Sequence, residues 1–182
     1  MIGTQRAWHI TCEKVPSQNG RSLFDWLQTR LVASDAVVVF CDDGAGEMAD
    51  FISIHETGAG PRIKLYHCKA SAEAQAGNRT ADLYVVCGQA VKSCVWVRPD
   101  QFLVRLRHRA ALRSVLGYIK GDETQANRIL SQQARQQVQF DMYIVQPGVL
   151  KEDRATELSN LLAATRYYMS QGGIDAFGVI GS

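Results

Sequence analysis

The chain has 182 residues, of which 46% are hydrophobic and 21% are charged, a composition typical of a globular protein that buries a core in one domain. The net charge of +2 identifies no charged partner, and no apolar run approaches the roughly 18–20 residues that cross a bilayer, so we expect no membrane partner. The five cysteines form no C-x-x-C pair and no secretion signal is evident, so we expect a reduced, cytoplasmic protein without a disulfide framework or a zinc site.

The N-terminal part of the sequence predicts a possible strand over residues 7–15 and then a helix over 22–31. Ser22 can cap the helix together with Asp25, three residues further on. Leucines recur at the spacing of one helix face, at Leu23, Leu27 and Leu31.

Three strands are predicted next, because β-branched and alternating apolar residues lie between turn-forming segments rich in Gly and Asp. They cover residues 37–41, 49–54 and 62–69. Their connections are short, so we expect them to be successive antiparallel neighbours in one sheet.

The remaining sequence alternates helical and strand patterns after a polar loop of about a dozen residues. The predicted helices cover residues 82–96, 100–113, 123–137 and 151–169, and the predicted strands cover 140–148 and 176–181. We therefore predict a single α/β domain over residues 1–182, with a mixed central sheet flanked by helices. The domain could also be one part of a larger protein.

Polar side chains gather at one predicted corner of this sheet. His67 and Lys69 end the third strand on its apolar face, and Asp50 opens the preceding strand. A hairpin would bring Asp50 close to both, and Glu47 lies in the turn leading to the same corner. Carboxylates bind hard divalent cations, and an ammonium stabilises charge on a phosphoryl group.

Each of these residues also has a plain structural interpretation. Asp50 and Glu47 can shape a turn. His67 can be a buried, hydrogen-bonded histidine, and Lys69 can be a solvated lysine at a strand end.

This pattern resembles the signature of the PD-(D/E)xK, or restriction-endonuclease-like, nucleases: an acid opens one strand, and acid-x-Lys ends the next. The matching residues are Asp50 in "EMADFISI" and Lys69 in "YHCK", with Gln89 in "VCGQAVKS" on the following helix. The longer strings, including "DDGAGEMADFISI" and "YIVQPG", resemble a nuclease-like domain at the C-terminus of some bacterial helicase-type proteins. The resemblance spans roughly residues 37–182.

The resemblance implies a restriction-endonuclease-like core that hydrolyses DNA, or less favourably RNA, with Mg²⁺ or Mn²⁺. The implied catalytic residues are Asp50, His67, Lys69 and Gln89, and the implied metal ligands are Asp50, Glu47 and His67. It also implies a helicase module in the same chain or in a partner chain. The acid that this family carries on its first helix would correspond to Asp25.

One residue departs from the family pattern, because His67 stands where an acid or Gln is usual. Imidazole suits borderline metals better than Mg²⁺. The site can therefore favour Mn²⁺, recruit Glu47 as the replacement carboxylate, or be catalytically impaired. In the last case the chain would be a nucleic-acid-binding or protein-interaction module.

A basic segment follows the second predicted helix. Five arginines and His108 lie between residues 98 and 113, against the single acid Asp100. Such a cluster can neutralise phosphates, and it can equally be a solvated helix face. The arginines predicted to contact nucleic acid are Arg105, Arg107, Arg109 and Arg113.

Overall fold

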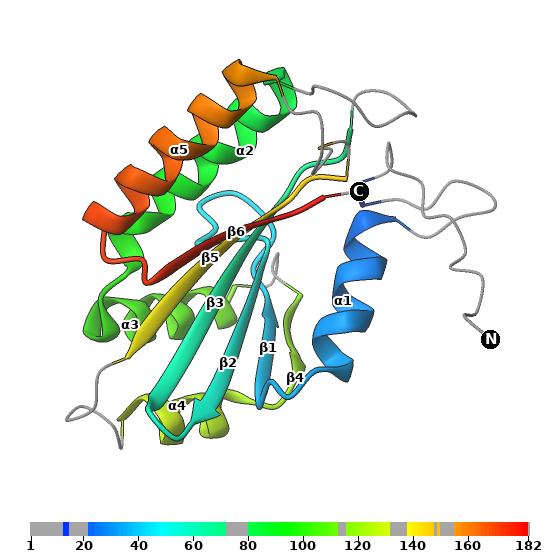
Figure 1. The fold of residues 1–182 in the computed structure, drawn as a ribbon. Helices are drawn as coiled ribbons and strands as arrows, with labels where there is room; N and C mark the ends of the chain where they lie inside the picture. The colour runs from blue at the N-terminus through cyan, green and yellow to red at the C-terminus, as the bar shows by residue number, and fades with distance from the viewer. Residues whose placement is uncertain are drawn as a thin grey trace, which may run out of the picture.

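A six-stranded sheet forms the centre of the computed structural model of this chain (Figure 1). The structure describes residues 13–14, 22–71, 80–112, 116–131, 138–147, 149 and 155–181. The strand order across the sheet is β4-β1-β2-β3-β5-β6. Their bounds are β1 Val38–Cys41, β2 Phe51–Thr57, β3 Gly60–Cys68, β4 Gly117–Lys120, β5 Gln139–Val145 and β6 Ala176–Ile180.

The sheet changes from antiparallel to parallel at β3. On one side β1, β2 and β3 form an antiparallel meander, and β4 adds an antiparallel edge to β1. On the other side β5 runs parallel to β3, and β6 runs parallel to β5. The antiparallel strands β1–β3 need only short connections, whereas the parallel strands are reached through helical crossovers. The sheet is therefore mixed, as predicted.

Helices cover the two faces of this sheet unequally (Figure 1). The side chains of α2, α3, α4 and α5 share the larger core with alternate strand residues such as Ile52, Ile54 and Leu65. Of the described helices, only α1 packs on the opposite face, in a smaller core with Phe51 and Cys68. The helix bounds are α1 Leu23–Ala33, α2 Thr80–Ser93, α3 Pro99–Ala110, α4 Glu123–Ser131 and α5 Thr156–Gln171, with a 3₁₀ turn at Cys94–Trp96.

The predicted fold class is confirmed, and so is the adjacency of the three successive strands. The predicted capping pair is confirmed too, because the Asp25 N–H donates to Ser22 Oγ at 3.1 Å and the Ser22 N–H donates to Asp25 Oδ2 at 3.2 Å. The predicted helix over 82–96 stays α-helical only to Ser93 and then tightens into the 3₁₀ turn.

Strand β4 was not predicted. It has four residues, "GYIK", and its burial does not alternate, so no period-2 pattern marks it in the sequence. Its strand conformation comes from pairing with β1 at the sheet edge. Most of the possible strand over 7–15, residues 132–137 of one predicted helix and residues 151–154 of another lie outside the described residues. No described helix combines the length and apolar character required to cross a lipid bilayer.

Candidate metal centre

A cavity of about 510 Å³ lies at the corner where the loop after β1, the end of β3 and helix α2 meet. Its lining includes residues 43–47 of that loop, Asp50 and His67 at strand ends, three residues of α2, and the separate segment 13–14. The corner predicted to be polar is therefore a cavity in the structure.

Three potential metal ligands meet in this cavity. Glu47, Asp50 and His67 each offer one ligand atom, and these atoms lie within 4.8 Å of one another. Phe51 pairs with Tyr66 in the antiparallel β2–β3 hairpin. The next residue beyond this pair on each side, Asp50 before Phe51 and His67 after Tyr66, therefore lies opposite the other. The predicted meeting of Asp50 with His67 is confirmed. The cluster, here called the Glu47–Asp50–His67 cluster, can hold a metal ion.

Backbone hydrogen bonds fix the two carboxylates. Asp50 Oδ2 accepts the N–H of Cys68 at 2.7 Å, across the end of the hairpin. Glu47 Oε2 accepts the N–H of Gly44 at 3.0 Å, which folds the loop back on itself. In each carboxylate the second oxygen can still coordinate an ion. The bonds therefore orient the carboxylates without using up their ligand capacity.

Ser93 on α2 forms a hydrogen bond with the ring of His67. Its Oγ lies 2.9 Å from His67 Nε2 and 3.1 Å from the carbonyl oxygen of Gln89. Where the single hydroxyl hydrogen is donated to that carbonyl, Oγ accepts the Nε2–H of His67. The lone pair is then on Nδ1, which is buried and has no hydrogen-bond partner in the structure. A histidine with an unpaired ring nitrogen, in a cluster with two carboxylates, fits a metal ligand.

Burial sets the protonation of the Glu47–Asp50–His67 cluster. It raises the pKa of the Asp50 carboxyl to about 7, against the opposing effect of the Cys68 N–H, and it also raises the pKa of Glu47. It lowers the pKa of His67 to about 4, so the imidazole is neutral at pH 7. A bound cation would counter the cost of these buried negative charges.

We expect metal affinity to rise with pH, because an ion competes with the proton of Asp50. The association constant for Mn²⁺ should increase about tenfold per pH unit below pH 7 and level off above it, as one proton is displaced per ion. Calorimetric titrations from pH 5.5 to 8 measure this slope. A pH-independent affinity would mean that Asp50 releases no proton when the ion binds.

Metal-free stability should depend much less on pH. Asp50 keeps a proton in the folded state that the unfolded state releases above its ordinary pKa of 3.8, so its contribution falls as pH rises from about 4 to 7. His67 lacks a proton in the folded state that the unfolded state holds below 6.5, so its contribution rises over about pH 4 to 6.5. The two effects oppose each other. Urea unfolding between pH 4.5 and 6.5 tests this cancellation.

Arginines from α3 hold the loop that carries Glu47. The Arg109 guanidinium pairs with the Asp42 carboxylate and donates to the Asp42 and Ala45 carbonyls, each at 2.7 Å. Asp42 Oδ2 also accepts the N–H of Met48 at 2.7 Å. Arg105 donates to the Gly46 carbonyl and lies over the Trp96 ring at 4.8 Å. The conformation of the loop therefore depends on α3.

The four arginines predicted to bind nucleic acid have different surroundings. Arg105 borders the cavity, through Gly46 and Trp96. Arg107 points toward α4, where its Nε donates to Asn127. Arg109 is 2% exposed and fully engaged with the loop, so we leave it out of any phosphate-binding surface. Arg113 lies outside the described residues.

Of the other predicted site residues, only some line the cavity. Gln89 lines the cavity, and its Oε1 is buried without a hydrogen-bond partner. Lys69 is not among the described residues lining the cavity, and its Nζ lies 3.5 Å from Glu13 Oε2. Asp25 is exposed and caps α1, so a helix cap explains it.

The sequence interpretation missed Ser93 and Lys14. Ser93 lies four residues after Gln89, so helical spacing alone could have placed both on one face of α2. Lys14 is adjacent to no motif, and nothing in the sequence marks it as a cavity residue.

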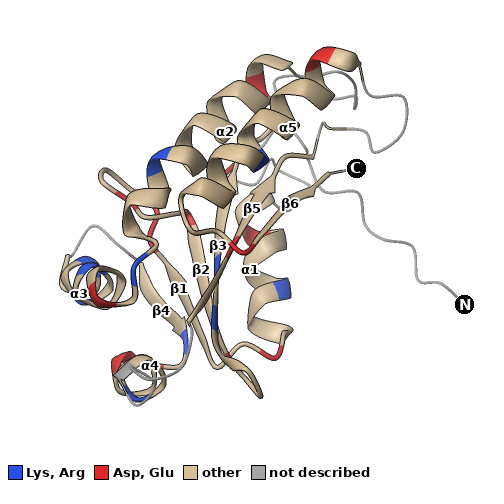
Figure 2. Ribbon diagram, turned by 60° about the vertical axis from the view of Figure 1, so that its left-hand side comes forward, with Lys and Arg blue, Asp and Glu red and all other residues tan. Residues whose placement is uncertain are grey.

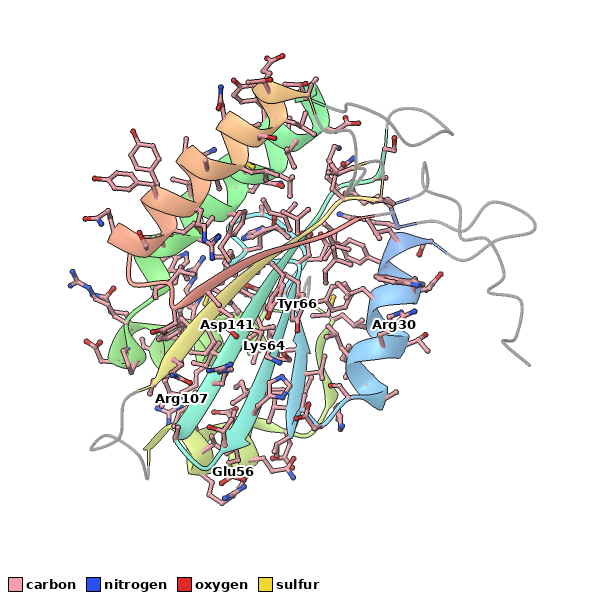
Figure 3. The ribbon with its side chains drawn as sticks, viewed as in Figure 1. Arg30, Glu56, Lys64, Tyr66, Arg107 and Asp141 are labelled. Carbon is pink, nitrogen blue, oxygen red and sulfur yellow. The ribbon has the colours of Figure 1, made fainter. Side chains whose placement is uncertain are left out.

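A second polar network lies on the opposite face of the sheet, the one that carries the neighbouring Lys64, Tyr66 and Asp141 in Figure 3. Ser53 Oγ is 2.9 Å from His55 Nε2, and His55 Nδ1 is 3.1 Å from Asp35 Oδ1. This order of groups matches a hydrolytic triad. Ser53 has no exposed surface, however, so no substrate can reach its hydroxyl. We interpret this network as structural.

Comparison with known proteins adds no relative to these observations: no family model, curated protein or solved structure significantly matches the chain.

Proposed function

We propose that the chain is a divalent-metal-dependent nuclease that hydrolyses phosphodiester bonds in DNA, with RNA as the less favoured substrate. The observation that carries this proposal is the Glu47–Asp50–His67 cluster inside a cavity that also contains lysines. Two carboxylates suit Mg²⁺ or Mn²⁺, and the imidazole favours Mn²⁺ of the two. The resemblance of residues 37–182 to PD-(D/E)xK nucleases supports the same function.

The charges lining the cavity suit a cation and a phosphate together. Two lysines, Lys14 and Lys92, face four carboxylates, which are Glu13, Asp43, Glu47 and Asp50. With all six groups ionised the lining carries two excess negative charges, which a divalent cation neutralises. The lysines can then attract an anionic substrate.

Each residue of the site has a proposed task. Asp50, Glu47 and the Nδ1 of His67 hold the ion, and Ser93 keeps the imidazole in the required tautomer. The unpaired Oε1 of Gln89 can accept a hydrogen bond from the attacking water. When bound, the ion would act as a Lewis acid toward the phosphate and lower the pKa of a water.

Nucleic-acid binding would involve few phosphate contacts. The Lys and Arg positions are spread over several helices and strands in Figure 2 rather than gathered in one stripe. Of the three described arginines in the predicted interface, only Arg105 borders the cavity. A small number of contacts gives a shallow dependence of affinity on salt. A helicase module, if present as a partner, would supply further affinity.

The proposal is tested by incubating the purified chain with plasmid and short DNA or RNA substrates, with Mg²⁺, Mn²⁺ or EDTA. Cleavage that requires the divalent ion supports the nuclease. Salt-sensitive binding without cleavage would instead identify a nucleic-acid-binding module. Neither cleavage nor binding would favour a protein-interaction module.

His67→Glu tests whether the imidazole limits the metal preference. A carboxylate at this position offers a harder ligand, so cleavage with Mg²⁺ should rise about tenfold relative to cleavage with Mn²⁺. His67→Ala, which offers no ligand, should lose activity with both ions. A ratio of Mg²⁺ to Mn²⁺ activity that is unchanged in His67→Glu would show that residue 67 does not ligate the ion.

A further inference from the structure

We infer that Lys14, from the segment before α1, is the lysine that contacts the substrate phosphate beside the Glu47–Asp50–His67 cluster. The inference rests on the proposed nuclease function and assigns to Lys14 the task that the sequence pattern assigns to Lys69. It also extends the site to a part of the chain outside the resemblance to known nucleases.

Glu13 anchors this segment at two places in the fold. Its carbonyl oxygen accepts the N–H of Phe24 at 3.0 Å, in the first turn of α1. Its Oε2 accepts the N–H of Ala70 at 3.2 Å, just beyond β3, and lies 3.5 Å from Lys69 Nζ. The backbone next to Lys14 is therefore fixed between α1 and the end of the strand that carries His67.

Lys14 projects from this anchor into the cavity. Its Nζ lies 2.7 Å from Asp43 Oδ1, and its side chain is 51% exposed, so the ammonium remains open to a ligand. The hydrogen bond to Asp43 raises the pKa of Lys14, with further contributions from Glu13 and Asp50, and the side chain stays charged at neutral pH. An ammonium has three donors, of which Asp43 occupies one. The others can bind phosphate oxygens.

Lys69 is less suitable for this contact in the observed arrangement. Its ammonium is paired with Glu13, which lines the cavity, whereas Lys69 is absent from the described lining. Lys69 therefore pairs with a residue of the cavity lining, whereas Lys14 belongs to that lining itself. Lys92 also lines the cavity, from the exposed side of α2, and is the competing candidate.

The test separates metal binding from phosphate binding in the full chain. Lys14→Ala, Lys69→Ala and Lys92→Ala are compared with Lys64→Ala, a control on the opposite face of β3 (Figure 3). Each variant is first titrated with Mn²⁺ alone. The Mn²⁺-loaded protein is then titrated with a DNA oligonucleotide containing phosphorothioate linkages, which resist hydrolysis. Thermal unfolding verifies that each variant folds.

Lys14→Ala should keep its Mn²⁺ affinity within about threefold and lose about tenfold or more in oligonucleotide affinity, as expected for a lost hydrogen bond between charged groups. Lys14→Arg should retain most of that affinity, and Lys64→Ala should match the wild type. The same loss in Lys69→Ala or Lys92→Ala, with Lys14→Ala unchanged, would overturn the inference but not the nuclease. An equal loss of Mn²⁺ affinity in Lys14→Ala would make Lys14 a structural support and also overturn it. A wild type that binds no Mn²⁺ would overturn both.

Discussion

Asp50→Asn should abolish measurable Mn²⁺ binding and lower the cleavage rate by about 10²–10³-fold, the loss typical of removing an electrostatic group from an active site. Asn has nearly the same shape and can still accept the N–H of Cys68, so the hairpin end keeps its hydrogen bond. What is lost is the negative charge. Calorimetry with Mn²⁺ and a plasmid cleavage assay measure the two effects.

The same substitution should leave the metal-free protein at least as stable as the wild type at pH 8. Burial raises the pKa of Asp50 to about 7, so its ionised form costs stability above that pH, and Asn removes this cost. Glu157→Gln, at an exposed position of α5, is the matched loss of one acid and should change neither property. Mn²⁺ binding by Asp50→Asn with wild-type affinity would eliminate the proposed centre.

Arg109→Ala should reduce the free energy of unfolding by about 3–5 kcal/mol, because it leaves the Asp42 carboxylate buried without its partner. The Ala45 carbonyl also loses its donor. Urea denaturation measures the change. Arg107→Ala, on the exposed side of the same helix, should stay within about 0.5 kcal/mol of the wild type.

A double variant tests whether the loss of stability in Arg109→Ala comes from the buried, unpaired charge of Asp42. Replacing Asp42 by Asn in addition to Arg109→Met should be less destabilising than Arg109→Ala alone, because no buried charge is then left unpaired. Both variants should weaken Mn²⁺ binding, since the loop that carries Glu47 loses its support. Full stability in Arg109→Ala would show that α3 does not hold this loop.

Much of the candidate site could be predicted from local patterns. The alternation along β3 places His67 on the core face, and the short hairpin brings Asp50 to it. The burial of Arg109 could also have been predicted, because Phe102, Leu106 and Arg109 recur at helical spacing on one buried face of α3. The cluster of arginines around Arg109 suggested a solvated face instead. A count of arginines does not distinguish such a residue from its solvated neighbours.

Other features depend on contacts that no local pattern encodes. Lys14 reaches the cavity only because Glu13 bonds to residues of α1 and of the segment after β3. Strand β4 exists because β1 offers an unpaired edge, whereas its own four residues have no strand periodicity. Both are tertiary effects, which override or replace local propensity.

The order of strands in the sheet also bears on how the site forms during folding. The hydrogen bond between Asp50 and Cys68 closes a loop of 18 residues, whereas the first pairing of β3 with β5, between Arg62 and Gln139, spans 77. Two doublings of loop length add about 1.2 kcal/mol of closure entropy. We therefore expect the Glu47–Asp50–His67 cluster to come together through local contacts, which form readily, and β5 to pair beside His67 later in folding. Strand β5 therefore packs beside a cluster that local contacts have already brought together.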